Sequence, residues 1–160
     1  MGTGEERIGG RQITTENVEL TVLCLVHQNG KYLVQDRVKE DWKGIALPGG
    51  HIERGESIVD AVIREMKEET GLTVTNPRLR GVKQFPIADG RYLVFLFETD
   101  EFEGVLRSSD EGEMFWIAKE ELSKVHLVDG FCDVLSVMLD ENLTEIQYVV
   151  DGENWKTVKK

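Results

Sequence analysis

A short amphipathic helix with its own start and stop signals constrains this 160-residue chain more than any other feature. Ser57 is a candidate N-cap, with Asp60 three positions later as a weak form of the capping box. Gly71 provides the stop signal at the other end. Between them, apolar side chains recur at helical spacing: Ile58, Val59, Ala61, Val62, Ile63 and Met66. A helix with such a face has to pack against another element, so a layered fold is expected.

The same helix carries a dense stripe of carboxylates. Glu65, Glu68 and Glu69 stand at i, i+3 and i+4, which places them on one face. Like charges at this spacing destabilise a helix by roughly 0.2–0.5 kcal/mol per pair. Arg64 relieves only part of this repulsion, and Glu56 adds a fourth acid just before the helix. Either the stripe is fully solvated or a cation neutralises it; hard oxygen ligands suit Mg²⁺ or Mn²⁺.

The rest of the chain predicts a mixture of strands and helices within one domain. Asn29-Gly30, between two strand-like runs, is a strong hairpin signal. Strands and helices do not alternate strictly, which favours an α/β (α+β) fold with a mixed β-sheet packed between helices. We expect strands at residues 18–26, 31–36, 45–47, 79–85, 92–99 and 115–117, an edge strand at 146–150, a helical turn at 119–122 and a second helix at 129–139.

Composition divides the chain into three parts. Residues 1–16 contain four glycines and little apolar periodicity, so we expect a mobile leader there. The domain follows at residues 17–143, and residues 144–160 form a C-terminal tail that contains the edge strand. Within the domain, Pro48-Gly49-Gly50 precedes the acidic helix as a predicted loop that exposes carbonyl groups and adopts positive φ. A loop of this kind beside the stripe favours a site over a merely solvated face.

The acidic helix and this loop together resemble a known family. The pattern G-x5-E-x7-R-E-U-x-E-E-x-G-U, in which U is bulky and aliphatic, is the Nudix box. Met66 is the one slight departure, because Ile, Leu or Val is commoner at that position. The box is filled by Gly50, Glu56, Arg64, Glu65, Met66, Glu68, Glu69, Gly71 and Leu72.

The resemblance implies a metal-dependent hydrolase. Nudix enzymes cleave a nucleoside diphosphate linked to another group, using Mg²⁺ or Mn²⁺ and a water that attacks phosphorus. By this resemblance Glu65, Glu68 and Glu69 are metal ligands, with the Gly49 carbonyl as a further ligand. Glu65 is also the candidate general base. An acidic helix and an acidic substrate can meet only with cations between them, so the residues and the family agree.

Further roles follow from the same resemblance. Arg64 orients a neighbouring glutamate, Glu56 holds the loop or Arg64, and Gly50 lies at the substrate. Many family members add a late carboxylate before a strand that carries a tryptophan. Glu111 is preferred to Glu113 for this role, although both being solvated stays open.

Two residues between the first hairpin and the box are candidate substrate contacts. Arg37 ends the second predicted strand, where MutT-like enzymes carry an arginine near the phosphates; a simple salt bridge is the alternative. Trp42 stacks on a base or caps the core, and the sequence does not decide between these.

Several substrates fit the family. The spacing most resembles MutT-like enzymes that cleave 8-oxo-dGTP to the monophosphate and pyrophosphate. Pro86 lies fourteen residues beyond Leu72, close to a proline found in ADP-ribose hydrolases, so ADP-ribose stays open. Nucleotide sugars and dinucleoside polyphosphates are further alternatives, and a non-catalytic nucleotide-binding module is the alternative from another class.

Charge and cysteine content limit partners and compartment. A formal net charge of −11 disfavours binding to polymeric nucleic acid. The chain has neither a membrane-length apolar run nor a signal-like start, so no membrane association and a cytoplasmic location are expected. Cys24 and Cys132 are predicted as reduced core cysteines. The resemblance also leaves open a homodimer, with residues 146–155 as an interface strand.

Overall fold

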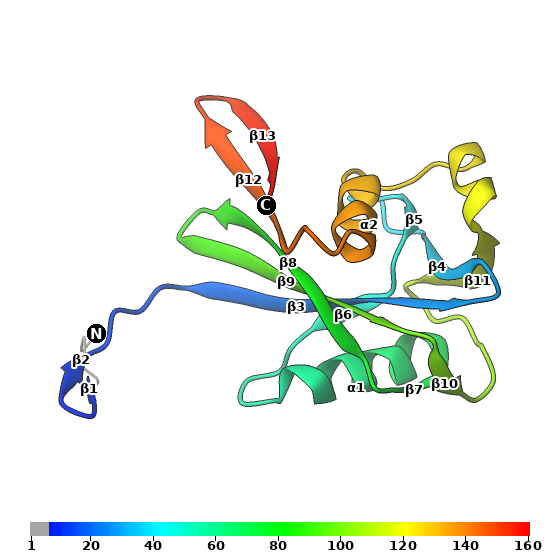
Figure 1. Ribbon diagram of the computed structural model, residues 1–160, viewed down its shortest axis with the longest axis horizontal. Helices are drawn as coiled ribbons and strands as arrows, with labels where there is room; N and C mark the ends of the chain where they lie inside the picture. Colours follow the sequence, from blue (N-terminus) through cyan, green and yellow to red (C-terminus); the bar gives the residue numbers. More distant parts are fainter. Residues whose placement is uncertain (1–6) are drawn as a thin grey trace.

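The computed structural model describes residues 7–160 of the chain. Residues 7–12 of the predicted leader form a small antiparallel ladder between β1 (Arg7–Ile8) and β2 (Arg11–Gln12), while residues 1–6 of that leader lie outside the described part. This ladder stands apart from the main body, at the end of an extended segment that leads into the sheet (Figure 1).

One large mixed sheet forms the centre of the molecule, which confirms the predicted fold class. Its strand order is β11-β4-β3-β9-β8-β12-β13, with β5 paired to β4 and β6 paired to β3. Parallel pairs, β3 with β9 and β12 with β8, occur beside antiparallel ones. The strands are β3 (Val18–Gln28), β4 (Lys31–Arg37), β5 (Gly44–Ala46), β6 (Gly49–His51), β8 (Arg78–Ile87), β9 (Gly90–Thr99), β11 (Gly112–Ala118), β12 (Glu145–Asp151) and β13 (Asn154–Lys159).

Strands β3 and β4 separate beyond their turn, and the gap between them holds β6, which contacts the candidate site. Asn29 and Gly30 both have positive φ, 50° and 73°, as a tight hairpin turn requires. The two strands pair only at their turn ends, His27 with Tyr32 and Gln28 with Lys31. Farther from the turn, β5 pairs with β4 and β6 pairs with β3. The chain between β5 and β6 therefore fills the gap between the two parent strands.

The prediction of a positive-φ loop at Pro48-Gly49-Gly50 is wrong. Gly49 and Gly50 belong to β6 and pair with Leu23 and Val22, and neither is among the residues with positive φ. Glycine is required there for space, because a Cβ at Gly49 would overlap the Val22 carbonyl oxygen. The glycines therefore permit close approach of backbones instead of an unusual turn.

Two helices cover opposite faces of the sheet (Figure 1). Helix α1 (Ile58–Thr70) has the predicted caps: the Asp60 N–H donates to the Ser57 hydroxyl at 3.4 Å, and Gly71 ends the helix at φ 78°. Helix α2 (Phe131–Leu139) packs on the other face. Each helix closes its own apolar core. The α1 core includes Val62, Met66, Leu33 and Phe97, and the α2 core includes Phe131, Val134, Leu96 and Ile146.

The C-terminal tail differs from the prediction. Strand β12, the predicted edge strand, lies inside the sheet between β8 and β13, and β13 forms the edge. Lys156 and Lys159 lie on that edge strand, and charged residues there discourage pairing with another chain. A small separate ladder joins β7 (Thr73–Thr75) to β10 (Glu101–Glu103), and a 3-10 helix spans Lys119–Lys124.

The two cysteines have different environments. Cys24 is buried, and burial raises its pKa to about 12. Cys132 is exposed on α2, so its predicted place in the core is wrong. Among residues 7–160, neither helix has the length and apolar character needed to cross a bilayer.

Candidate active site

The three glutamates of the predicted stripe share one face of α1 but differ in environment. Glu65 is buried, with 9% of its surface exposed, because its side chain turns toward β6. The Glu68 side chain is 55% exposed. Glu69 accepts a hydrogen bond of 2.6 Å from the Ser109 hydroxyl, on the loop before β11. Helical periodicity aligns the three carboxylates, and the neighbouring strand and loop distinguish them.

Gly50 is placed directly against the stripe. A Cβ at Gly50 would overlap the Glu65 carboxyl group, whose Oε1 lies 2.6 Å from the Cβ position. Strand β6 is held at this distance by its pairing with β3, so the gap cannot widen freely. Only glycine leaves room for the buried carboxylate at this position.

Arg64 joins the acids into one network. Its Nε donates to Glu56 Oε1 at 2.7 Å, and its Nη2 donates to Glu56 Oε2 at 3.0 Å. Nη1 donates to Glu65 at 2.9 Å and to Glu68 at 3.2 Å. Nη2 also donates to the His51 carbonyl at 2.9 Å, which links the helix to the end of β6. A planar guanidinium can serve this many acceptors because its five donors point outward in a fixed fork.

The network shifts two carboxyl pKa values in opposite directions. The hydrogen bonds from Arg64 and from the Glu53 backbone lower the pKa of Glu56 to about 2. Burial raises the pKa of Glu65, although its bond to Arg64 opposes the shift. Arg64 itself stays protonated, since its bond to Glu56 raises its pKa. Glu65 is therefore the more basic of these two carboxylates.

The donor set fits a hard divalent cation. Among residues 7–160, no three His, Cys, Asp or Glu side chains converge closely enough to form a complete metal cage. A cationic nitrogen, Nη1 of Arg64, does lie within 3.2 Å of both Glu65 and Glu68, so a positive charge is already accepted between them. The side chains that could coordinate a metal here all offer carboxylate oxygens, which suit Mg²⁺ or Mn²⁺ better than zinc.

Glu111, the predicted late carboxylate, lies on the loop that reaches the acidic stripe. Ser109, which bonds Glu69, also accepts a hydrogen bond from the Glu111 N–H at 3.2 Å. The Glu111 side chain pairs with Lys39 at 2.8 Å. Glu113 is exposed on β11. The loop therefore carries Glu111 close to the acidic network through Ser109, whereas its carboxylate is held by a lysine.

Arg37 and Trp42 contact each other. The Arg37 guanidinium lies 4.8 Å from the centre of the Trp42 ring, and Arg37 Nε donates to the Trp42 carbonyl at 3.1 Å. Trp42 is 37% exposed and lines a cavity on the α2 face of the sheet. The pair joins the end of β4 to the loop before β5.

Sequence reasoning missed several groups at the site. Ser109 and Lys39 have no motif of their own, because each acts through a contact with a residue 40 or 72 positions away. The His51 carbonyl was also missed, since a backbone group has no signature in the sequence. The only sequence signal for His51 is its position directly after Gly50 of the box.

We expect Gly50→Ala to lower kcat at least tenfold, because the added methyl group displaces the Glu65 carboxylate from Arg64. Steady-state kinetics and thermal melting measure the change. Gly30→Ala is the control: it places a methyl group at positive φ with nothing within 4 Å, so it adds only backbone strain. Equal effects of both variants on kcat would contradict the role of Gly50.

Comparison with known proteins identifies the family. A model of the NUDIX domain matches residues 18–132. The uncharacterized Nudix hydrolase YvcI of Bacillus subtilis is 34% identical over 122 residues, which cover 72% of this chain and 76% of that protein. An ADP-ribose pyrophosphatase of Methanocaldococcus jannaschii is 37% identical over 92 residues, covering 56% of this chain and 54% of that protein.

Solved structures agree. The crystal structure of a MutT protein from Bacillus halodurans superposes with a TM-score of 0.70 at 29% identity, covering 87% of this chain and 97% of that one. A bifunctional NMN adenylyltransferase/ADP ribose pyrophosphatase from Francisella tularensis, solved with AMP and a Mn ion, has a TM-score of 0.60 at 26% identity over 81% of this chain and 43% of that one. The chain belongs to the Nudix domain family. It is a nucleotide diphosphate hydrolase of MutT-like fold.

Proposed function

We propose that this enzyme hydrolyses a nucleoside triphosphate, in the manner of MutT-like enzymes that act on 8-oxo-dGTP or dGTP, to the monophosphate and pyrophosphate. The observation that carries the proposal is the network of Glu56, Glu65 and Glu68 around Arg64. Its position against β6 keeps Glu65 buried and basic, while Glu68 is exposed and the neighbouring Glu69 bonds Ser109 of the 108–111 loop.

Each residue has a proposed role. Glu65, Glu68, Glu69 and the Gly49 carbonyl would hold Mg²⁺ or Mn²⁺, with Glu111 joining them when it leaves Lys39. When bound, the metal would supply positive charge at the phosphates and would lower the pKa of a bound water.

Glu65 and Arg64 also have proposed roles apart from metal binding. Glu65 takes the proton of the attacking water. Arg64, anchored by Glu56, keeps that carboxylate oriented.

The proposed substrate contacts come from the end of β4, from the loop that follows it and from β6. Arg37 would contact a phosphate, and Trp42, which it already contacts, would lie against the base. Gly50 leaves the space in which substrate and carboxylate meet.

A substrate panel tests the proposal. With Mg²⁺ we expect pyrophosphate and a monophosphate from dGTP or 8-oxo-dGTP, detected by chromatography and a pyrophosphatase-coupled assay. Turnover of ADP-ribose alone would favour the second candidate. That candidate is supported by the name of the Methanocaldococcus jannaschii relative and by Pro86 on β8. No turnover of any nucleotide in the panel would contradict both.

Mg²⁺ or Mn²⁺ is expected to raise Tm, because ligands that bind only the native state stabilise it by about 2.7 kcal/mol at a hundredfold excess over Kd. For a chain of this size that corresponds to roughly 5–10 °C. Differential scanning fluorimetry measures the shift, with NaCl at matched ionic strength as control. An unchanged Tm up to about 10 mM metal would contradict a metal site in the native state.

A further inference from the structure

A buried lysine lies on the face of the sheet opposite the acidic network. Lys83, on β8, is only 8% exposed and lines a cavity between the sheet and the start of α2. Most of the other walls are apolar, and Trp42 is the most exposed apolar member. The apolar walls include Leu23, Ala46, Leu47, Val128 and Phe131.

The ammonium group of Lys83 lacks a protein acceptor. Among residues 7–160, no carboxylate lies within 4.0 Å of its Nζ and no group accepts a hydrogen bond from it. Two ring faces hold it instead: Nζ lies 4.9 Å from the Tyr148 ring centre and 5.9 Å from that of Phe85. Among the described residues, Gln35 Nε2 is the only fully buried side-chain polar atom without a hydrogen-bond partner, so the Lys83 Nζ keeps some exposure although its side chain is largely buried. A lysine this buried without an ionic partner is unusual.

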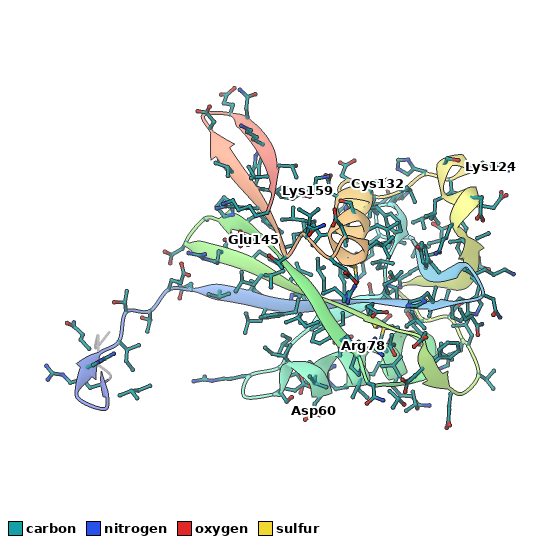
Figure 2. The ribbon with its side chains drawn as sticks, viewed as in Figure 1. Asp60, Arg78, Lys124, Cys132, Glu145 and Lys159 are labelled. Atoms are coloured by element: carbon teal, nitrogen blue, oxygen red, sulfur yellow. The ribbon has the colours of Figure 1, made fainter. Side chains whose placement is uncertain are left out.

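The nearest acid on α2 is already engaged. Burial lowers the pKa of Lys83, and the charge of Asp133 opposes this shift only in part. Asp133 itself pairs with Lys159 of β13 at 3.3 Å. Figure 2 shows Lys159 beside α2, where the C-terminal hairpin meets the helix. Asp133 therefore does not satisfy the three N–H donors of Lys83.

The cavity and the acidic network share a wall. Leu23 lines the cavity and pairs with Gly49 of β6, and Leu47 lies two residues before Gly49. The next residue, Gly50, touches Glu65 on the other side. To join the acids to Lys83, a nucleotide would therefore have to pass this strand.

We propose that Lys83 determines which base the enzyme accepts, and that it selects a purine with a carbonyl at position 6 over one with an amino group there. This inference rests on the proposed function. An ammonium group only donates hydrogen bonds. A 6-oxopurine offers it O6 and N7 as acceptors, whereas adenine presents an amino donor beside N7. The apolar walls and Trp42 suit the flat ring.

A phosphate is a poorer occupant of the same cavity. Lys83 is the only cationic side chain among the described residues that line it, and the acidic Asp129 also lines it. A phosphate needs several donors, and apolar walls provide none. A neutral ring with acceptors along one edge suits an apolar cavity whose one cationic donor group is the Lys83 ammonium.

Base entry requires movement at Trp42. The cavity holds about 20 Å³, which is room for a single water molecule. Trp42 is on an exposed loop between β4 and β5, and Arg37 contacts its ring. Opening the cavity therefore also moves Arg37, which couples the base to the proposed phosphate contact.

Binding of IMP and AMP by the full chain tests the proposal, since these two nucleotides differ at position 6 of the base. Isothermal titration without divalent metal should show IMP bound at least tenfold more tightly than AMP. Lys83→Met should remove this preference, mainly through weaker IMP binding. Lys83→Gln should reverse it, because a carboxamide pairs with N6 and N7 of adenine.

Lys119→Met is the matched control. Its Nζ also lies over a ring, 5.3 Å from the centre of Tyr32, but Lys119 is exposed and outside the cavity. We expect this variant to keep the wild-type preference. Melting curves show whether each variant folds, and the wild-type ratio is informative even if Lys83→Met does not fold.

Several results would overturn the proposal. Equal wild-type affinities for IMP and AMP would do so, as would an unchanged preference in Lys83→Met or an equal loss of inorganic pyrophosphate binding in that variant. Hydrolysis of ITP and ATP with Mg²⁺ separates the two claims. Base preference without turnover contradicts the proposed function alone, and turnover without preference contradicts the role of Lys83 alone.

Discussion

Glu69→Gln is expected to lower kcat by about a hundredfold or more while leaving the fold intact. The amide keeps the size of the side chain but cannot provide an anionic oxygen to a divalent cation. Loss of an outer-shell partner of a metal already costs about 10–100-fold, so loss of a direct ligand should cost more. Removing one of three like charges from α1 should leave Tm unchanged or raise it.

Steady-state kinetics at saturating Mg²⁺, together with thermal melting, measure the effect of Glu69→Gln. Glu141→Gln is the control, because Glu141 is exposed in the turn before β12 and outside the network. A Glu69→Gln enzyme with near wild-type kcat would show that this carboxylate is not a metal ligand. If the loss of activity were accompanied by a clear fall in Tm, the result would point to a structural role of Glu69 through Ser109.

Arg64→Met is expected to reduce both stability and activity. Arg64 donates to three carboxylates and to the His51 carbonyl, and the partly buried Glu56 and Glu65 would lose their cation. Removing one partner of a buried ionic network leaves unpaired charge, so we expect Tm to fall by about 5–10 °C. Activity should fall further, because Glu65 loses its orientation. Arg54→Met, an exposed change in the loop between β6 and α1, should do neither.

The pH dependence gives this variant a second readout. The pKa of Glu56 is lowered to about 2 in the folded chain, from an ordinary value of 4.5. Its bond to Arg64 therefore contributes stability above pH 4.5, and this contribution is lost as the pH falls toward 2. Wild type and Arg64→Met should differ most near neutral pH and converge in acid. Glu65 acts in the opposite sense, because its raised pKa costs stability once it ionises. A constant difference across this range would contradict the pairing.

Local features were predicted well because their causes are local. The caps at Ser57 and Gly71, the hairpin at Asn29-Gly30 and the common face of the carboxylates follow from turn chemistry and helical periodicity. Features that depend on pairing between distant segments were not predicted. Gly49 was predicted in a loop because only its pairing with β3 reveals a strand.

The sequence by itself determined that three carboxylates and an arginine share one turn-and-a-half of helix, because 3.6 residues per turn fixes that arrangement wherever the helix lies. Only the tertiary structure decided which of them is buried. Glu65 turns toward β6 and becomes basic, Glu69 meets Ser109 from a loop 40 residues away, and Lys83 loses its solvent to β12 and α2. Burial depends on which distant segment packs against each side chain, and the spacing of residues along one helix carries no record of that.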